Sequence, residues 1–309
     1  MKTAAVALCA ACLLASCARP TLPGPKIDPA LVMLIPPDTQ TLGGLRLEAL
    51  QKTDAYKKYF AQQKIPQIDT FAEQTGIDPR KDLWEVLFIS NGKDNALVGH
   101  GKFSDEAEPR LQKNGGKRFA YKGFNLVGDE NNAILLMSPS VAAVGNTAEL
   151  KAMVDAREKG SPPPPALAAL IKDMPATSHV WVAYNGGPLK SPLDLPGNLA
   201  NINRIAQSIQ SATLYLDFSL GITGLAGGAC TSEQDAQQVE AALKALIGLG
   251  RLSTPANQSD LQRVWDGLRV TEQERQVKVH IDEAPELLDR ALSLLVGRTG
   301  LPAPLSPRQ

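Results

Sequence analysis

SATLYLDFSLGITGLAGGACTSEQDAQQVEAAL, residues Ser211–Leu243, is the stretch that decides the predicted fold class. Over Thr213–Leu220, leucine and phenylalanine alternate with mostly polar residues, which is the two-residue period of a half-buried strand. Gly221 turns the chain into a second strand over Ile222–Cys230. The pattern therefore predicts two consecutive strands joined by a tight turn.

A long helix is predicted directly after these strands. Ser232 occupies its N-cap position, where a serine hydroxyl accepts a backbone N–H of the first turn. Apolar residues then recur at helical spacing up to Gly248 or Gly250. Paired strands beneath a helix predict an α+β fold with largely antiparallel sheets and packed helices. The apolar stripe consists of Ala236, Val239, Leu243, Leu246 and Ile247.

The rest of the chain alternates strand and helix patterns in the same way. Strands are predicted at Leu31–Ile35, Thr41–Leu47, Leu83–Ser90, Ala96–Phe103, Arg118–Val127, Ala133–Met137, Val141–Val144, His179–Tyr184 and Gln276–Asp282. Helices are predicted at Glu48–Gln74 with an interruption near Pro66, from Ser104, over Thr147–Lys159, around Leu261, Val264, Trp265 and Leu268, and from Pro285 onward.

A proline run, Ser161–Pro165, divides the chain into parts of similar length and predicts a boundary or an extended loop. We expect one α+β lobe over residues 30–160, a second over 161–300, and a frayed tail over 301–309. A shift of 127 residues places Gly101–Glu106 on Gly228–Glu233, both at a strand end that enters a helix. Duplication of one lobe and independent use of the same helix cap both explain this match.

The N-terminus, MKTAAVALCAACLLASC, has the features of an export signal. Lys2 precedes an uncharged, mostly apolar run over Thr3–Ser16, which is shorter than the roughly 20 residues that span a bilayer. The run ends in Leu14-Ala15-Ser16-Cys17, which resembles the lipobox of bacterial lipoprotein precursors. The resemblance implies that residues 1–16 are removed and that Cys17 receives a diacylglycerol and an N-terminal acyl chain.

A lipid on Cys17 would anchor the protein to a membrane, because two or more acyl chains bind a bilayer stably. The proline-rich residues 18–29 would then form a semi-rigid tether. Ala18 is not the aspartate that retains many such proteins at the inner membrane. In a host with two membranes, the resemblance therefore implies the outer membrane, facing the periplasm. The alternatives are an ordinary secretory signal cut after Ala18 and an uncleaved anchor.

Composition excludes some functions and leaves others open. The chain has 32 basic and 32 acidic residues, 5% aromatic residues and no Lys/Arg run, which argues against nucleic acid as a partner. Cys230 is the one cysteine beyond the signal and the anchor, and its small-residue strand predicts a buried, inert thiol.

Residue spacings give no catalytic constellation. His100, His179 and His280 lie far apart in strand patterns and match no metal-ligand spacing. Gly224–Ser232 precedes a helix but lacks the spacing of a phosphate-binding loop. Among the acidic residues, Asp217 is the one candidate for a functional role, although a position on a solvated strand face explains its presence more simply. We therefore expect no catalytic residue, no metal and no cofactor.

The loop Gly186–Asn198, GGPLKSPLDLPGN, is the most promising contact segment. It presents Leu189, Leu193 and Leu195 without helical or strand periodicity, and long loops in compact domains are often functional. These three leucines are therefore candidate partner contacts. The alternative is a loop that folds back and covers the edge of the core.

Together these features favour a non-catalytic, membrane-anchored envelope lipoprotein that binds a protein or another envelope component. The rival hypothesis is a carrier of an apolar ligand such as a lipid, and an enzyme is third. A carrier requires an apolar cavity of several hundred Å³. An interaction module requires a filled core and an exposed apolar patch.

Replacing Cys17 with serine tests the anchor. The Cys17→Ser variant is expected to lose acyl labelling and to accumulate as unprocessed precursor, because the thioether can no longer form. Metabolic labelling with a fatty acid and a gel shift of the precursor measure both effects. Normal processing of the variant would instead show ordinary secretion.

Overall fold

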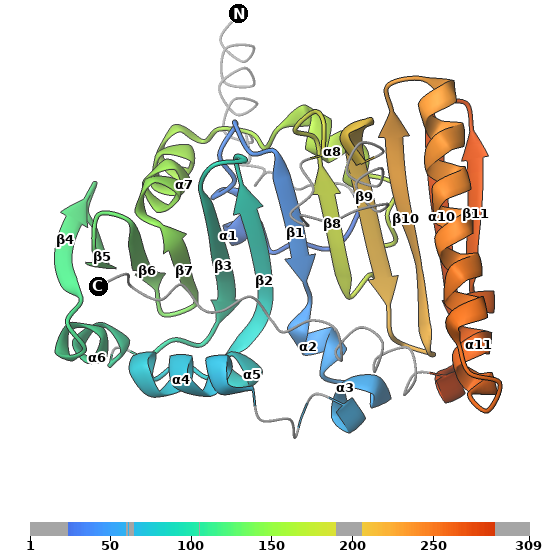
Figure 1. Ribbon diagram of the computed structural model, residues 1–309. Coiled ribbons are helices and arrows are strands. Elements are labelled where there is room, and N and C mark those ends of the chain that lie inside the picture. The colour runs from blue at the N-terminus through green and yellow to red at the C-terminus, as the bar shows by residue number, and fades with distance from the viewer. Residues whose placement is uncertain (1–23, 60, 62–64, 105, 190–205, 288–309) are drawn as a thin grey trace, which may run out of the picture.

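The chain folds into a single antiparallel sheet flanked by helices, so the predicted α+β class is confirmed (Figure 1). The structure is a computed structural model that describes residues 24–59, 61, 65–104, 106–189 and 206–287. The 12-stranded sheet has the order β11-β12-β10-β9-β8-β1-β2-β3-β7-β6-β5-β4. Within these described ranges, no helix is both long and apolar enough to cross a bilayer.

The strands are numbered in the order in which they occur along the chain. They are β1 (Thr41–Leu45), β2 (Leu83–Ser90), β3 (Asn95–Gly101), β4 (Lys117–Tyr121), β5 (Phe124–Gly128), β6 (Asn132–Ser138), β7 (Val141–Asn146), β8 (Val180–Tyr184), β9 (Ile209–Asp217), β10 (Ile222–Cys230), β11 (Leu268–Gln273) and β12 (Gln276–Glu283).

Both halves of the chain contribute to this sheet, because β1 pairs antiparallel with β8 at its centre. The five strands of each half that lie nearest this pairing have the same connectivity, and β5 and β4 extend the first half beyond β6. The first places its strands in the order β1-β2-β3-β7-β6, and the second places its own as β8-β9-β10-β12-β11. The strands on either side of the proline run thus share one sheet, with similar topology in each part. A common origin of the two parts stays a prediction.

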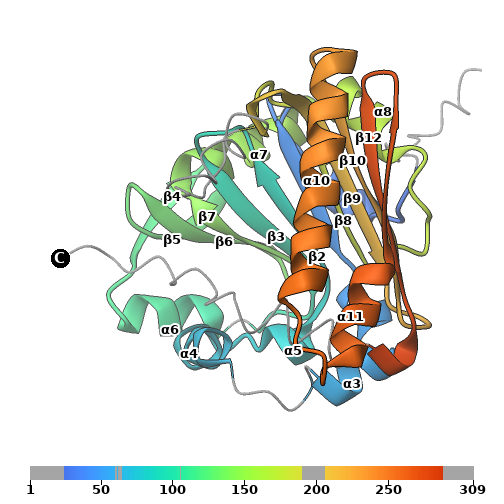
Figure 2. The same ribbon diagram turned by 45° about the vertical axis from the view of Figure 1, so that its right-hand side comes forward.

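Helices lie on both faces of the sheet. They are α1 (Pro29–Val32), α2 (Leu47–Leu50), α3 (Asp54–Tyr59), α4 (Pro66–Thr75), α5 (Pro79–Asp82), α6 (Ala107–Lys113), α7 (Thr147–Lys159), α8 (Pro165–Ile171), α10 (Glu233–Ser253) and α11 (Ser259–Asp266), with a short 3₁₀ turn at Pro285–Leu287. We call the face that carries α1, α7 and α8 the back face, and the face that carries α10 the front face (Figures 1 and 2).

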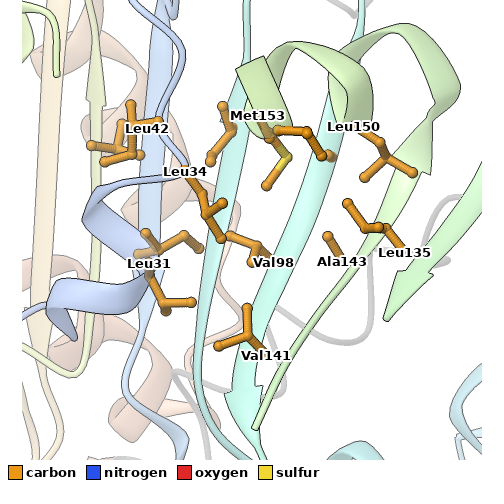
Figure 3. Packing of buried hydrophobic residues seen from close by; sticks show 14 of the residues in the cluster. Leu31, Leu34, Leu42, Val98, Leu135, Val141, Ala143, Leu150 and Met153 are labelled. Carbon is orange, nitrogen blue, oxygen red and sulfur yellow. The ribbon is translucent and has the colours of Figure 1, made fainter. Parts of the chain in front are cut away.

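The main hydrophobic core lies on the back face (Figure 3). Leu31 and Leu34, in and just after α1, pack with Met153 of α7 against strand residues such as Leu42 and Val98, and all five are at most 1% exposed. Burying a leucine-sized side chain contributes about 1.5–3 kcal/mol. The back face therefore contributes most of the buried apolar surface that stabilises the fold.

One predicted strand is wrong. Leu31–Ile35 was expected to be extended, but the structure places α1 at Pro29–Val32. Asp28 caps this helix, since its Oδ1 accepts the N–H of Ala30 at 2.7 Å, and Pro29 fits the first turn because it needs no donor. A local cap thus overrides the strand propensity of the apolar run.

Further boundaries differ from the prediction. The strand expected over Arg118–Val127 is a hairpin of β4 and β5, because Lys122 and Gly123 have positive φ values of 46° and 84° and reverse the chain. Leu268, expected in a helix, begins β11 after α11 ends at Asp266. The bounds of β2, β10 and α7 agree with the prediction. The strand predicted over Thr213–Leu220 is instead β9 at Ile209–Asp217, and the helix predicted over Glu48–Gln74 is three separate helices, α2, α3 and α4.

Gly44 of β1 permits the closest packing in the sheet centre. A Cβ there would lie 2.2 Å from Nε1 of Trp181, a side chain with no exposed surface. Gly44→Ala is therefore expected to lower the free energy of unfolding by about 1–3 kcal/mol. Gly248→Ala in α10 is the control, because the space around Gly248 is open and alanine favours a helix by roughly 0.5–1 kcal/mol. Urea unfolding that shows no difference between the two variants would contradict this packing.

Candidate functional site

Strand β2, LWEVLFIS, carries apolar side chains toward both faces of the sheet. Leu87 and Ile89 point to the back face and have no exposed surface. Phe88 points to the front face and remains 37% exposed. A strand of an antiparallel sheet with one solvated face usually alternates apolar and polar residues. The apolar side chains on the front face of β2 are therefore not explained by packing of the back face alone.

The front-facing side chains of seven neighbouring strands form a line of directly paired positions. We call this line the apolar row. Each member faces the next across an antiparallel pair, from β9 through β8, β1, β2, β3 and β7 to β6. Strands lie about 4.8 Å apart, so the row spans roughly 29 Å. Its members are Leu214, Val182, Gly43, Phe88, Leu97, Val144 and Ile134.

The middle of the apolar row is the most exposed part. Leu97 is 46% exposed beside Phe88, its cross-strand partner. Gly43 is buried, and a Cβ there would lie 3.4 Å from Val182 Cγ2 and 3.7 Å from Phe88 Cβ, so these two side chains flank it closely. Adjacent large apolar residues that remain exposed in a sheet centre indicate a binding surface rather than scattered surface leucines.

Helices cover the front face only beyond the two ends of this exposed stretch (Figure 2). Ala236 and Val239 of α10 pack over β11 and β12. Near the other end, α4 and α6 join a cluster that includes Ala142 of β7. The described helices therefore leave the centre of the apolar row open.

The helix α10 adds exposed leucines of its own. Leu246, Leu249 and Leu252 are 39%, 58% and 85% exposed, so Leu246 does not lie in the buried stripe as predicted. Arg251 binds Asp266 of α11 at 3.0 Å. At 100° per residue, Leu249 lies on the opposite side of α10 from Arg251, and hence faces away from α11.

A polar cavity of about 570 Å³ opens at the base of β2 and β3. Glu85 and His100 are cross-strand neighbours here, and both bind Asp28. The N–H of Asp28 donates to Glu85 Oε2 at 3.0 Å, and His100 Nδ1 lies 3.2 Å from Asp28 Oδ2. The remaining lining residues are Lys26, Ile27, Arg46, Glu48, Ala49, Lys52 and Trp84.

Burial governs the chemistry of Glu85. Desolvation raises the pKa of its carboxyl to about 7, and the nearby Asp28 carboxylate adds to the rise, while the N–H of Asp28 opposes it. Oε1 of Glu85 is buried and has no hydrogen-bond partner among the described residues. The edge of Trp84 packs on the His100 ring, with centroids 4.9 Å apart.

These polar groups hold the N-terminal segment against the back of the sheet. Asp28 uses one oxygen to cap α1 and the other to face His100. Four residues earlier, Gly24 has φ +94°, and a Cβ there would lie 2.0 Å from the carbonyl oxygen of Ile171 in α8. Residues 24–28 are therefore held against the sheet and α8 beside this cavity.

The predicted contact loop is described only in part. Leu189 is half-buried, and its N–H donates to the carbonyl of Ile209 at 3.0 Å. Leu193, Leu195 and the predicted anchor Cys17 lie outside the described residues. Partner contact by this loop and lipidation of Cys17 stay predictions.

The cysteine and two of the histidines considered in the sequence have roles in packing or lie on the surface. Cys230 is buried as predicted, and burial raises the pKa of its thiol. His280 lies on an exposed strand position, also as predicted. His179 is buried, which lowers its pKa, and its Nδ1 accepts the N–H of Phe218 and lies 3.5 Å from Asp217. Among the described residues, no three His, Cys, Asp or Glu side chains form a group that could hold a metal ion.

The apolar row and the buried Glu85 were missed in the sequence. One signal was present. Apolar residues in Leu83–Ser90 occupy consecutive positions, and the third position carries the one acid, Glu85. That pattern indicates a strand with two apolar faces, and an acid within it indicates a buried carboxyl.

Comparisons with known proteins identify a shared fold. No protein-family model matches the chain, and no curated protein matches it. A solved structure of TP0453 in crystal form III is similar with a TM-score of 0.50 and 10% identity, over 85% of this chain and 97% of that chain. Crystal form I of TP0453 gives a TM-score of 0.46 and 12% identity, over 85% and 96%. At such identities the likeness concerns the fold alone.

The raised pKa of Glu85 predicts a pH-dependent stability. Its folded pKa of about 7 exceeds the ordinary value of 4.5, so its contribution is complete below pH 4.5 and is lost as the pH rises through 7. Glu85→Gln should therefore be more stable than the parent at pH 8, by about 3 kcal/mol at most, and similar to it at pH 4. Denaturant titrations at both values measure this, and equal stability at pH 8 would contradict a buried Glu85 carboxylate.

Proposed function

We propose that this protein is a lipid-anchored, non-catalytic interaction module of the cell envelope, which binds a protein partner through the apolar row. The observation that carries the proposal is the exposure of Phe88 and Leu97, paired side chains in the middle of a 12-stranded sheet. A monomer gains no stability from leaving these rings and methyl groups in water, whereas a partner that covers them gains about 25 cal/mol per Å² of apolar area.

The size of the row suits a protein partner. Its length of roughly 29 Å matches the dimensions of a standard interface, which buries about 800 Å² on each partner. Its centre has two large apolar side chains, Phe88 and Leu97, and paired strands of the sheet hold them in a fixed arrangement. A fixed surface loses little conformational entropy when a partner binds.

The rival hypothesis of a lipid carrier has weaker support. The back face is filled by the main core, and the cavity beneath β2 and β3 is lined by charged groups including Asp28, Glu85 and Lys52. A pocket that encloses an apolar ligand needs predominantly apolar walls. The apolar row is instead an open surface. It therefore suits a protein partner whose own surface can cover the exposed side chains.

The place of the N-terminal segment is compatible with an anchor. Gly24 and Asp28 dock on the back layer, against α8 and the base of β2 and β3. A lipid on Cys17 at the outer membrane, facing the periplasm, would therefore hold the protein through its back layer. The front face would remain free to meet a partner in the envelope.

Polar substitution of the exposed pair tests the proposal. Phe88→Ser with Leu97→Ser is expected to cost about 1 kcal/mol per residue or less in stability and to abolish cross-linking to the envelope partner. Leu220→Ser is the matched control, because Leu220 is 83% exposed and lies outside the row. Cross-linking in intact cells and urea unfolding measure the two effects.

The same experiment separates the rival hypothesis. Native mass spectrometry of the parent protein should show no co-purifying lipid under the proposal. A bound lipid that the Phe88→Ser, Leu97→Ser variant loses would instead support a carrier. Unchanged cross-linking of that variant would overturn the apolar row as the binding surface.

A further inference from the structure

We infer that the cavity at the base of β2 and β3 is a binding site for a small organic anion, whose carboxylate or phosphate group meets Arg46 and Lys26 and whose flat part stacks on Trp84. None of the residues that line this cavity belongs to the apolar row. The site is therefore separate from the surface proposed for a protein partner. Three properties of the cavity support this class of ligand: its size, the charge of its lining and the fixed positions of the lining residues.

The cavity has the size of a small-molecule site. Its volume of about 570 Å³ lies within the range of roughly 300–1,000 Å³ that is typical of ligand pockets. Four parts of the chain supply its walls, namely the N-terminal segment before α1, the stretch around α2, the start of β2 and the end of β3. A pocket built from four separate segments exists only in the folded chain.

The lining has positive charge that is not used within the protein. Lys52 is paired with Glu48 at 2.7 Å, so these two side chains neutralise each other. Lys26 and Arg46 form no ion pair with any residue that the structure describes. Two cations that line one cavity without a carboxylate partner suit an anionic ligand.

The remaining acids do not cancel this charge. Asp28 is occupied, since one of its oxygens caps α1 and the other lies 3.2 Å from Nδ1 of His100. Burial raises the pKa of the Glu85 carboxyl to about 7, so this group is mostly uncharged at mildly acidic pH. With Glu85 protonated, the lining has three Lys or Arg side chains against two carboxylates. The cavity then attracts anions.

Arg46 has a fixed guanidinium group with N–H donors to spare. Its backbone N–H donates to the carbonyl of His179 at 2.8 Å, and its Nη1 donates to the carbonyl of Ala176 at 2.9 Å. Nε and Nη2 have no hydrogen-bond partner in the part of the chain that the structure describes. Because a guanidinium presents its N–H groups in a planar fork, it binds a carboxylate or a phosphate through two parallel hydrogen bonds. Arg46 is therefore the main anion contact.

Lys26 is positioned by its neighbours on both sides in the chain. Gly24 lies so close to α8 that a Cβ there would overlap the helix backbone. Two residues after Lys26, the N–H of Asp28 donates to Glu85 Oε2 at 3.0 Å. The backbone of Lys26 is thus held at the cavity before a ligand arrives, which reduces the entropy lost on binding.

Trp84 provides a flat apolar wall. Its side chain is 41% exposed, although tryptophan is on average a highly buried residue. The His100 ring lies at 87° to the indole, with centroids 4.9 Å apart, so His100 covers at most one face of it. Aromatic side chains beside a few convergent polar groups are the usual lining of a small-molecule site. A ligand with its flat part on Trp84 and its anionic group toward Arg46 uses both features.

Calorimetric titration of the full chain tests this site. Phenyl phosphate and benzoate are the probes, because each joins an anionic group to a flat ring. Inorganic phosphate and benzyl alcohol are the controls, because each has only one of the two parts. At pH 6, where Glu85 is mostly protonated, at least one probe should bind with a Kd of about 1 mM or less, and the controls at least tenfold more weakly.

Substitutions in the lining assign the binding to this cavity. Arg46→Gln and Lys26→Gln should each weaken binding of the probe at least tenfold, because each removes a charged hydrogen-bond donor. Trp84→Ala should weaken it at least fivefold, whereas Trp84→Phe keeps a ring and should bind within twofold of the parent. Lys172→Gln is the matched control, because Lys172 is exposed at the end of α8 and outside the cavity, and its affinity should equal that of the parent.

Three results would overturn the site. The first is no binding of either probe at about 10 mM. The second is equal affinity of the parent and the Arg46→Gln and Lys26→Gln variants, because the probe would then bind elsewhere. The third is equal affinity for inorganic phosphate and phenyl phosphate, since Trp84 would then play no part. Urea unfolding checks that the variants fold, and Lys26→Gln keeps the test decisive because the Lys26 side chain is exposed and has no ion pair among the described residues.

One further variant separates this site from the apolar row. The chain with Phe88→Ser and Leu97→Ser should bind the probe as tightly as the parent, whether or not it still cross-links to an envelope partner. Loss of probe binding in that variant would place the anion on the apolar row and overturn the cavity as its site.

Discussion

The structure depends on the burial of one face of a very wide sheet. The pairing of β1 with β8 joins two sets of strands into a single surface, and α1, α7 and α8 cover the back of it. Trp181 lies at this junction, fully buried, in space that Gly44 leaves free. Because the back face carries the main core, the fold can leave part of the front face uncovered without losing its stability. An uncovered front face is what makes a binding surface available.

Much of the local structure was predictable from the sequence, because it depends on local signals. The bounds of β2, β10 and α7 follow from alternation, a turn glycine and helical periodicity. Where a cap or a turn competes with an apolar run, prediction failed, as at α1 beside Asp28 and at the Lys122–Gly123 turn. In both cases one or two residues with a specific cap or turn conformation determine the local structure, although the neighbouring apolar residues favour a strand.

The candidate site was less predictable, because it depends on pairing between distant strands. The contact of Phe88 with Leu97 lies within one predicted hairpin and could be anticipated. The continuation of the row from Leu97 to Val144, and from Gly43 to Val182, requires the order of strands in the sheet. No local pattern specifies that order, so the sequence could indicate an apolar surface somewhere but could not place it.

The docking of the N-terminal segment has a mechanical consequence. Asp28 is bound to Glu85 of β2 and His100 of β3, and both strands lie far from either sheet edge. Gly24 is wedged against α8 a few residues earlier. A pulling force on the N-terminus would therefore enter the molecule at the middle of its sheet, where each strand has neighbours on both sides. Edge strands would not bear this force first, so strand separation would not begin at an edge of the sheet.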